Sequence, residues 1–186
     1  MYGCQQNLIQ STPELEFVCS RANKFTNQGI YFARQLYFKT GKCIKKYDLD
    51  KEYKKSRHYK AFYSQVAQPV LLSLWESFKS YKELLKLWKS GKLAEKPKRP
   101  NYRKKGGLTV VSYPKQTLKL HDDRVRVPLG KLVKAWFGID HFYVEMHSNL
   151  NFNDIRELRI LPRNGYFYLV VATNPSLGTF CSYMLH

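Results

Sequence analysis

Basic and aromatic residues are interleaved in one short stretch, residues 96–107, with the sequence KPKRPNYRKKGG. A tyrosine ring can stack on a nucleic-acid base, an arginine guanidinium can hold a phosphate through two hydrogen bonds, and lysines add point charges. The prolines favour an extended, semi-rigid backbone, and the glycines let that backbone approach a ligand closely. Solvated linkers often have a similar composition, so the stretch alone is a weak signal. The residues that it offers for binding nucleic acid are Lys98, Arg99, Tyr102, Arg103, Lys104 and Lys105.

The basic pattern begins before this stretch, on a segment that we expect to be helical. Its lysines recur at spacings of 3, 4 and 3 residues, which places them along one side of a helix. A ridge of this kind is usually only a solvated helix face, but here it leads directly into residues 96–107. We therefore add its members to the predicted binding surface: Lys79, Lys82, Lys86 and Lys89.

The distribution of charge indicates the kind of partner. The chain of 186 residues has a formal net charge of +18. Residues 79–105 hold eleven basic and two acidic residues, so +9 of the +18 lies in this segment. Because so much like charge disfavours a compact chain, we expect a polyanionic partner, with nucleic acid favoured over an anionic membrane. No apolar run approaches the ~20 residues that a membrane-spanning helix needs.

Histidines and aspartates could suggest a metal site, but adjacent polar residues of this type are more typical of a hairpin turn. The histidines elsewhere have no partners at the spacing of metal ligands. We therefore expect no catalytic residue, no metal, no cofactor and no small-molecule substrate. The residues considered are His121, Asp122, Asp123, Asp140 and His141, with His58 and His147 isolated.

The cysteines form no recognisable functional set either. They make no CxxC pair, and no supporting motif marks one of them as a nucleophile. Incidental thiols in a reducing cytoplasm are the expected interpretation. The cysteines are Cys4, Cys19, Cys43 and Cys181.

A first long helix is predicted after Thr12, which can act as its N-cap. Pro13 suits its first turn, and Gly41 is expected to end it. Residues 27–29 could bend this helix. The charged sequence DLDKEYKKS, residues 48–56, resembles the start of another helix.

The strongest helical periodicity runs from Val66 to Trp88. Its apolar residues recur mainly three and four residues apart, and we expect the apolar face to be buried. Pro69 is unexpected in this segment because proline removes a helix hydrogen bond and introduces a kink, unless the helix breaks there.

After residue 107 the pattern changes to short segments with a period of two, separated by turn residues. Asn164 and Gly165 suit a two-residue turn between Ile155–Leu161 and Tyr166–Ala172. This part predicts a small antiparallel sheet or barrel. Its weaker candidates for phosphate contacts are Arg124 and Arg126.

Four motifs in a fixed order carry a family resemblance. They are SQVAQ at residues 64–68, the aromatic pair Phe78 and Tyr81, the stretch at residues 96–107, and SYP at residues 112–114. Together they resemble the TnpB, or OrfB, family of bacterial insertion sequences. The later segments VRVPLGKLVKAWF and IRELRILPRNGYFYLVVA resemble the strand pairs that follow in that family. The resemblance covers about residues 1–172.

The resemblance implies both a fold and a function. TnpB proteins are transposon-encoded relatives of type V CRISPR nucleases, and their N-terminal half is a β-barrel wedge domain with an inserted helical recognition domain. In the family these parts hold a structured guide RNA and read a short motif beside the target DNA, while the guide reads the sequence. The expected class is α+β, with a wedge-like antiparallel β-barrel at residues 1–10 and 108–172, recognition helices at 11–95, a basic connector at 96–107 and an unstructured, off-pattern tail at 173–186.

The sequence departs from the family after the last predicted strand, where the RuvC-type nuclease motif GIDLG should follow. That motif and the two CxxC pairs of the family's zinc ribbon are absent, and residues 138–140 lack the Leu-Gly that would complete it. We therefore expect a truncated, transposase-associated protein of the bacterial cytoplasm or nucleoid that binds guide RNA or DNA without its own catalytic centre. The alternatives are an inert remnant of a decayed insertion sequence, or an accessory DNA-binding protein that acts with a full-length nuclease.

Overall fold

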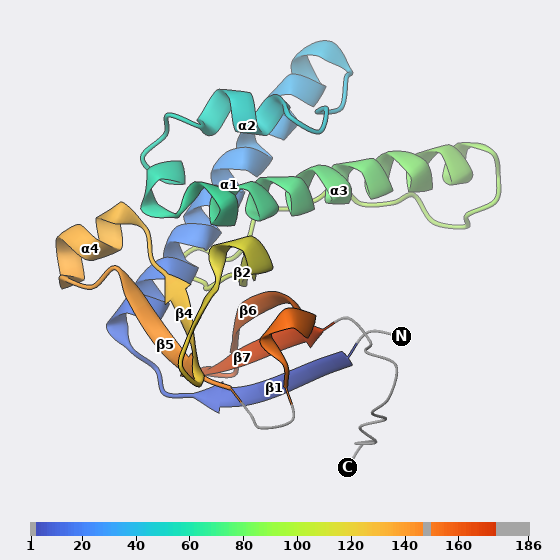
Figure 1. The fold of residues 1–186 in the computed structure, drawn as a ribbon. Helices are drawn as coiled ribbons and strands as arrows, with labels where there is room; N and C mark the ends of the chain where they lie inside the picture. The colour runs from blue at the N-terminus through green and yellow to red at the C-terminus, as the bar shows by residue number, and fades with distance from the viewer. Residues whose placement is uncertain (1–2, 147–149, 174–186) are drawn as a thin grey trace.

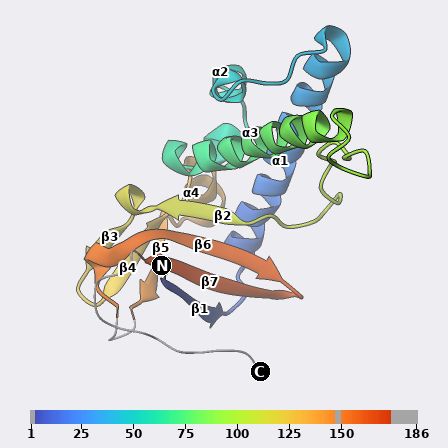
Figure 2. The same cartoon turned by 90° about the vertical axis from the view of Figure 1, so that its right-hand side faces the viewer.

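Two antiparallel β-sheets and four α-helices make up the described residues, 3–146 and 150–173, of this computed structural model (Figures 1 and 2). The predicted α+β class is confirmed. The helices are α1 (Pro13–Thr40), α2 (Asp48–Tyr53), α3 (Ser64–Lys89) and α4 (Lys131–Phe137), with the short 3₁₀ helices η1 (Tyr59–Ala61), η2 (Lys115–Thr117) and η3 (Phe152–Asp154). The strands are β1 (Gly3–Ile9), β2 (Val111–Pro114), β3 (Lys119–His121), β4 (Arg124–Pro128), β5 (His141–Glu145), β6 (Ile155–Arg163) and β7 (Tyr166–Thr173).

The order of the strands shows how the helices are inserted. The four-stranded sheet has the order β1-β7-β6-β2, and the three-stranded sheet has the order β3-β4-β5. β1 therefore pairs with β7, from Gly3 opposite Thr173 to Ile9 opposite Phe167, although α1, α2 and α3 lie between β1 and β2 in the chain. β1, within the residues 1–10 that the resemblance assigns to the β-unit, is an edge strand of this sheet.

The described strands do not form the closed barrel that the resemblance implies. β1 and β5 each pair with another strand on one side only. Closure would require these two edges to exchange backbone hydrogen bonds. Side chains of both strands, with Leu15 of α1, instead line an open cavity between them.

The local signals at the ends of α1 are confirmed. Thr12 is extended backbone before the helix, and Pro13 opens it, although the Thr12 side chain makes no capping hydrogen bond. Gly41 ends the helix with a φ of 68°, and its N–H donates to the Tyr37 carbonyl at 2.8 Å. Glycine suits this left-handed position because it has no Cβ to clash.

Residues 27–29 do not interrupt α1, which is continuous from Pro13 to Thr40. The role of Gly29 is in helix packing. A Cβ at this position would lie 2.6 Å from Cδ2 of Leu74 on α3. The glycine therefore lets α1 and α3 pack closely.

The apolar face of α3 is buried only over part of the helix. Phe78 and Tyr81 are buried, whereas Leu84 and Leu87, which continue the same periodicity, are each 42% exposed. The distal end of α3 extends away from the other helices and the sheets (Figure 1). The prediction that the whole face is core is therefore wrong beyond Tyr81, where Leu84 and Leu87 are exposed and Trp88 is only half-buried.

Pro69 lies near the start of α3, and the helix continues through it. Its ring lacks the N–H that would bond to the Gln65 carbonyl and crowds that carbonyl instead. We expect Pro69→Ala to raise the free energy of unfolding by about 1–2 kcal/mol, measured by urea denaturation. Pro97→Ala, at a position outside any helix, is the control and should give no gain. An unchanged or lower stability for Pro69→Ala would contradict the expectation.

Two hairpin turns follow from local sequence. Asn164 (φ 52°) and Gly165 (φ 79°) connect β6 to β7, which confirms the predicted two-residue turn. Asp122 (φ 53°) and Asp123 connect β3 to β4. The aspartates after His121 are thus turn residues, as the sequence indicated.

Residues 131–137 form α4, where the resemblance predicts strands. Gly130 precedes the helix, and Gly138, with a φ of 75°, ends it by donating its N–H to the Lys134 carbonyl. Val133 is fully buried, and the neighbouring apolar side chains follow helical spacing. The glycine at each end and the helical spacing of the apolar residues explain why this segment is a short helix and not a strand.

The buried side chains of the helices and of both sheets form one cluster. Phe25 of α1, Val127 of β4 and Leu158 of β6 are among its fully buried members. Because one core joins these elements, the helices have fixed positions relative to the sheets.

The predicted unstructured tail begins within β7, since Thr173 still pairs with Gly3. Its remaining residues, 174–186, lie outside the described residues. No described helix is long and apolar enough to cross a membrane.

Candidate nucleic-acid interface

The lysine ridge, which comprises Lys79, Lys82, Lys86 and Lys89, lies on the exposed side of α3. Nζ of Lys79 lies 5.4 Å from the centroid of the Trp75 ring. Nζ of Lys86 lies 3.3 Å from Oε1 of Glu83, and both side chains are largely exposed. Because solvent screens such a pair, Glu83 offsets little of the charge of the ridge.

Residues 96–107, called the connector from here on, return alongside α3 (Figure 1). Nζ of Lys96 lies 5.2 Å from the centroid of the Trp88 ring, and Nε of Arg99 donates to the Tyr81 hydroxyl at 3.4 Å. The step from Trp88 to Tyr81 covers about 10 Å of helix. The step from Lys96 to Arg99 covers about the same length of extended chain. The connector is therefore extended, as predicted, and antiparallel to α3.

Arg99 fastens the connector to α1 as well. Its Cζ lies 4.7 Å from the centroid of the Tyr37 ring and 4.9 Å from that of Phe38. Together with the hydrogen bond to Tyr81, these contacts occupy the guanidinium on both helices. We therefore assign Arg99 a positioning role ahead of a direct contact with phosphate.

Asn27 of α1 fixes the backbone of the connector. Its Oδ1 accepts a hydrogen bond from the Arg103 N–H at 2.7 Å, and its Nδ2 donates to the Arg103 carbonyl at 3.1 Å. One asparagine side chain thus satisfies both backbone polar groups of Arg103. The Arg103 side chain remains exposed.

Further contacts follow the same side of α1. Gly107 packs so closely that a Cβ there would lie 3.2 Å from Nδ2 of Asn23. The Thr109 N–H donates to the Cys19 carbonyl at 3.1 Å. Cys19, Asn23 and Asn27 are four residues apart, which places them on one stripe of the helix. The connector therefore lies along α1 over several turns.

Tyr102 keeps part of its ring available for stacking. Cζ of Arg34 lies 5.2 Å from the centroid of this ring, and Nη1 of Arg34 donates to Oδ1 of Asn101 at 3.2 Å. The tyrosine is still 45% exposed. Arg34 thus supports the ring from α1 and leaves room for a base.

The other basic side chains of the connector project into solvent from this fixed backbone. They have no acidic partner within residues 3–146 and 150–173. Their charge is therefore available to a polyanion. The residues are Lys98, Arg103, Lys104 and Lys105, together with Lys96 beside the Trp88 ring.

Arg124 and Arg126 are not part of this surface. Both lie on β4, in the three-stranded sheet. Nη2 of Arg124 lies 3.8 Å from Oε1 of Glu145, and Nη2 of Arg126 lies 3.6 Å from Oδ1 of Asp140. The structure thus separates these two candidates from the connector and gives each an acidic neighbour.

Sequence reasoning missed the residues of α1 that hold the connector: Asn23, Asn27, Arg34, Tyr37 and Phe38. The signal that could have found them is a polar residue among the apolar residues of a predicted helix. Asn23 is only 4% exposed, within a helix whose other buried residues are mostly apolar. Buried amides need hydrogen-bond partners. Oδ1 of Asn23 accepts from Nδ2 of Asn27 at 3.3 Å, and Asn27 bonds to the Arg103 backbone, a partner that the sequence does not show.

Comparison with protein-family models and with curated proteins gives no match for this chain. The resemblance to TnpB proteins therefore remains a prediction that rests on the sequence motifs.

The histidine and acidic side chains of the described residues do not gather into a metal site. Within these residues, no group of three histidine, cysteine, aspartate or glutamate side chains could hold a metal ion. Asp140 instead contacts His141 and Lys134, and these hydrogen bonds, His141 first, lower the pKa of its carboxyl group. Burial raises the pKa of the Cys19 thiol to about 12, so this thiol stays protonated.

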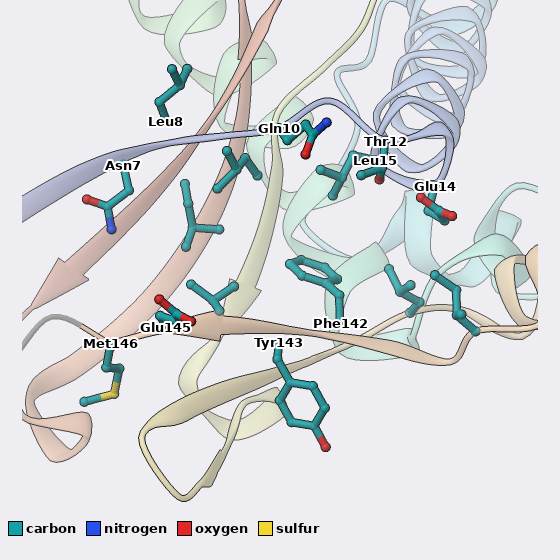
Figure 3. Close-up of a pocket in the computed structure, with 15 residues that line it drawn as sticks. Asn7, Leu8, Gln10, Thr12, Glu14, Leu15, Phe142, Tyr143, Glu145 and Met146 are labelled. Carbon is teal, nitrogen blue, oxygen red and sulfur yellow. The ribbon is translucent and has the colours of Figure 1, made fainter.

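A cavity of about 610 Å³ between β1 and β5 is chemically unlike the basic surface (Figure 3). The Phe142 side chain points into it, whereas that of Tyr143 points away. Its lining is mostly apolar, and its charged lining residues are Glu14 and Glu145. A cavity with acidic and apolar walls does not suit a phosphate group.

Proposed function

We propose that this protein binds nucleic acid through the lysine ridge and the connector. The observation that carries the proposal is the fixed position of the connector: Asn27 and Arg99 hold its backbone, while its other basic side chains face solvent. Charges on a fixed backbone lose less conformational freedom on binding than charges on a free linker. Tyr102 adds a ring on which an unpaired base can stack.

The sequence motifs favour a finer proposal about the ligand. By resemblance to TnpB proteins, it is a structured guide RNA together with the adjacent target DNA, and the protein binds them without cleaving a strand. Binding should then depend on backbone shape and charge more than on duplex sequence. A labelled strand incubated with the protein and Mg²⁺ should stay intact.

A binding assay at two salt concentrations tests the proposal. A fluorescent RNA hairpin and a DNA duplex are titrated with the protein, and anisotropy gives the affinity. We expect tight binding at low salt that weakens steeply as salt rises, because each bound phosphate releases counterions. Absence of binding at low salt by a cooperatively folded chain would refute the proposal. A chain that unfolds without cooperativity would instead favour the inert remnant.

Matched charge variants locate the surface. Glutamine replaces four exposed lysines of the interface, Lys82, Lys89, Lys104 and Lys105, in one variant. The control replaces four exposed lysines elsewhere, Lys42, Lys51, Lys119 and Lys131. We expect the interface variant to lower the slope of log affinity against log salt by about 3, and the control to change it far less. Equal losses in both variants would mean that net charge alone governs binding.

A further inference from the structure

Four basic side chains around α1 lie near enough to one another to interact electrostatically. Arg21 and Lys24 come from α1, and Arg57 and His58 come from the segment between α2 and η1. We call them the Arg21 cluster. With 3.6 residues per turn, Arg21 lies on the side of α1 that faces away from Asn23 and Asn27. Arg21 is therefore separate from the connector, whereas Lys24, three residues before Asn27, lies between the two sites.

The packing of α4 completes this site. A Cβ at Gly130 would lie 1.8 Å from the Ala61 carbonyl oxygen, so the start of α4 lies directly against η1. This contact places Trp136 beside α1. Cζ of Arg21 lies 4.7 Å from the centroid of the Phe17 ring and 5.6 Å from that of Trp136. Two rings thus hold the guanidinium in position.

The cluster has positive charge without compensation. None of its four side chains has an acidic partner in the part of the chain that the structure describes. Nδ1 of His58 is buried and has no hydrogen-bond partner among the described residues. Like charges held together without an acid destabilise a fold unless an anion joins them. Uncompensated cations beside an unpaired ring nitrogen are features that suit the binding of an anion.

Electrostatics agree with this geometry. Burial, followed by the charge of Arg57, lowers the pKa of Arg21. Burial and then the charges of Arg21, Lys24 and Arg57 lower the pKa of His58. His58 is therefore neutral near pH 7 in the free protein.

We propose that the Arg21 cluster binds a phosphate group of a nucleic-acid strand as a second contact, separate from the lysine ridge and the connector. The guanidinium groups of Arg21 and Arg57 can each donate two hydrogen bonds to phosphate oxygens, and Lys24 adds a point charge. Trp136, which is 58% exposed, offers a ring beside the phosphate for an unpaired base. This inference deepens the proposed function and rests on it for the identity of the ligand.

Binding at this site should take up a proton. An anion beside His58 favours its charged form, so the pKa of His58 rises on binding. The affinity should therefore increase as the pH falls from about 8 to about 6, through the range in which histidine titrates. The charged groups that face His58 are Arg21 and Lys24 of α1 and Arg57 beside it.

A matched pair of variants tests the site. Lys24→Gln with Arg57→Gln removes one lysine and one arginine from exposed positions of the cluster, and Lys119→Gln with Arg163→Gln removes the same charges elsewhere. With a short single-stranded oligonucleotide, we expect the first pair to lower the salt slope by about 1.5 and the second to leave it nearly unchanged. His58→Gln should also remove the gain in affinity at low pH.

The outcomes separate this inference from the proposed function. Equal behaviour of the two double variants would overturn the inference, even if the interface variant of α3 and the connector loses binding. A loss of binding in the Lys24–Arg57 variant, with no loss in the lysine variant of α3 and the connector, would support the inference and contradict the proposed surface. As a second measurement, inorganic tripolyphosphate added to the wild-type protein should shift the His58 ring signals in NMR spectra and raise its pKa. Unchanged His58 signals would overturn the inference.

Discussion

Replacing Gly130 by alanine is expected to lower the free energy of unfolding by about 3 kcal/mol. A Cβ at this position would lie 1.8 Å from the Ala61 carbonyl oxygen, 2.5 Å from its carbonyl carbon and 2.9 Å from Cα of Phe62. All three atoms belong to the backbone, so no rotation of a side chain relieves the overlap. The φ of −72° at Gly130 suits any residue, and the loss is therefore purely steric.

Gly138, at the other end of α4, is the matched control. It has a φ of 75°, and a Cβ at this position would have no neighbouring atom within 4 Å. Gly138→Ala therefore costs only the left-handed backbone, about 1–2 kcal/mol. Urea denaturation of both variants measures the difference. A smaller loss for Gly130→Ala than for Gly138→Ala would contradict the close approach of α4 and η1.

The Gly130 variant also bears on function. Displacement of α4 moves Trp136 away from Arg21, because α4 carries the ring on which the guanidinium stacks. Under conditions where the variant remains folded, we expect it to weaken binding at the Arg21 cluster while leaving the connector intact. Gly130→Ala should thus lower both the stability of the fold and the affinity of the Arg21 cluster for its ligand.

The sequence predicted those elements whose signals are local. Pro13 and Gly41 marked the ends of α1, and Asn164 with Gly165 marked the turn between β6 and β7. Each signal works through the φ of one residue or a missing N–H, and neither depends on distant parts of the chain. The packing of the rest of the chain therefore does not alter their effect.

Features that depend on distant partners were predicted poorly. Periodicity placed the apolar face of α3 correctly but did not show that its partners end near Tyr81, which leaves Leu84 and Leu87 exposed. The strands of the expected barrel exist, yet the sequence did not show that β1 and β5 stay apart. How far along α3 the packing extends, and whether the strands close into a barrel, both depend on contacts between distant parts of the chain.

The residues of the candidate site also divide into those that the sequence identified and those that only the structure shows. Composition identified the basic residues of the connector, but not the asparagine of α1 that holds it. The Arg21 cluster escaped notice because residues 21–24 and 57–58 are distant in sequence and meet only after folding. His58, which looked isolated in the sequence, has cations as its neighbours in the structure.

Replacing Asn27 by leucine is expected to free the connector without changing the charge of the protein. The change removes two hydrogen bonds to the backbone of Arg103, at 2.7 and 3.1 Å. Together these bonds contribute about 1–3 kcal/mol to holding the connector on α1. The amide of Arg103 should then exchange with solvent about tenfold faster or more, measured by hydrogen exchange.

Gln35→Leu is the matched control on the same helix. Gln35 makes no side-chain hydrogen bond to any residue that the structure describes, so this variant should exchange at Arg103 as the wild type does. Both variants have the net charge of the wild type. Any difference between them therefore reports on the position of the connector.

The effect of Asn27→Leu on nucleic-acid binding distinguishes position from charge. A free connector must be ordered when it binds, so the affinity should fall by about tenfold. The number of phosphate contacts stays the same, and the slope of log affinity against log salt should therefore not change. The lysine variants lower that slope, whereas this one lowers affinity at every salt concentration alike. Faster exchange with unchanged affinity would mean that a free connector binds as well as a fixed one, and would contradict the pre-organisation that supports the proposed site.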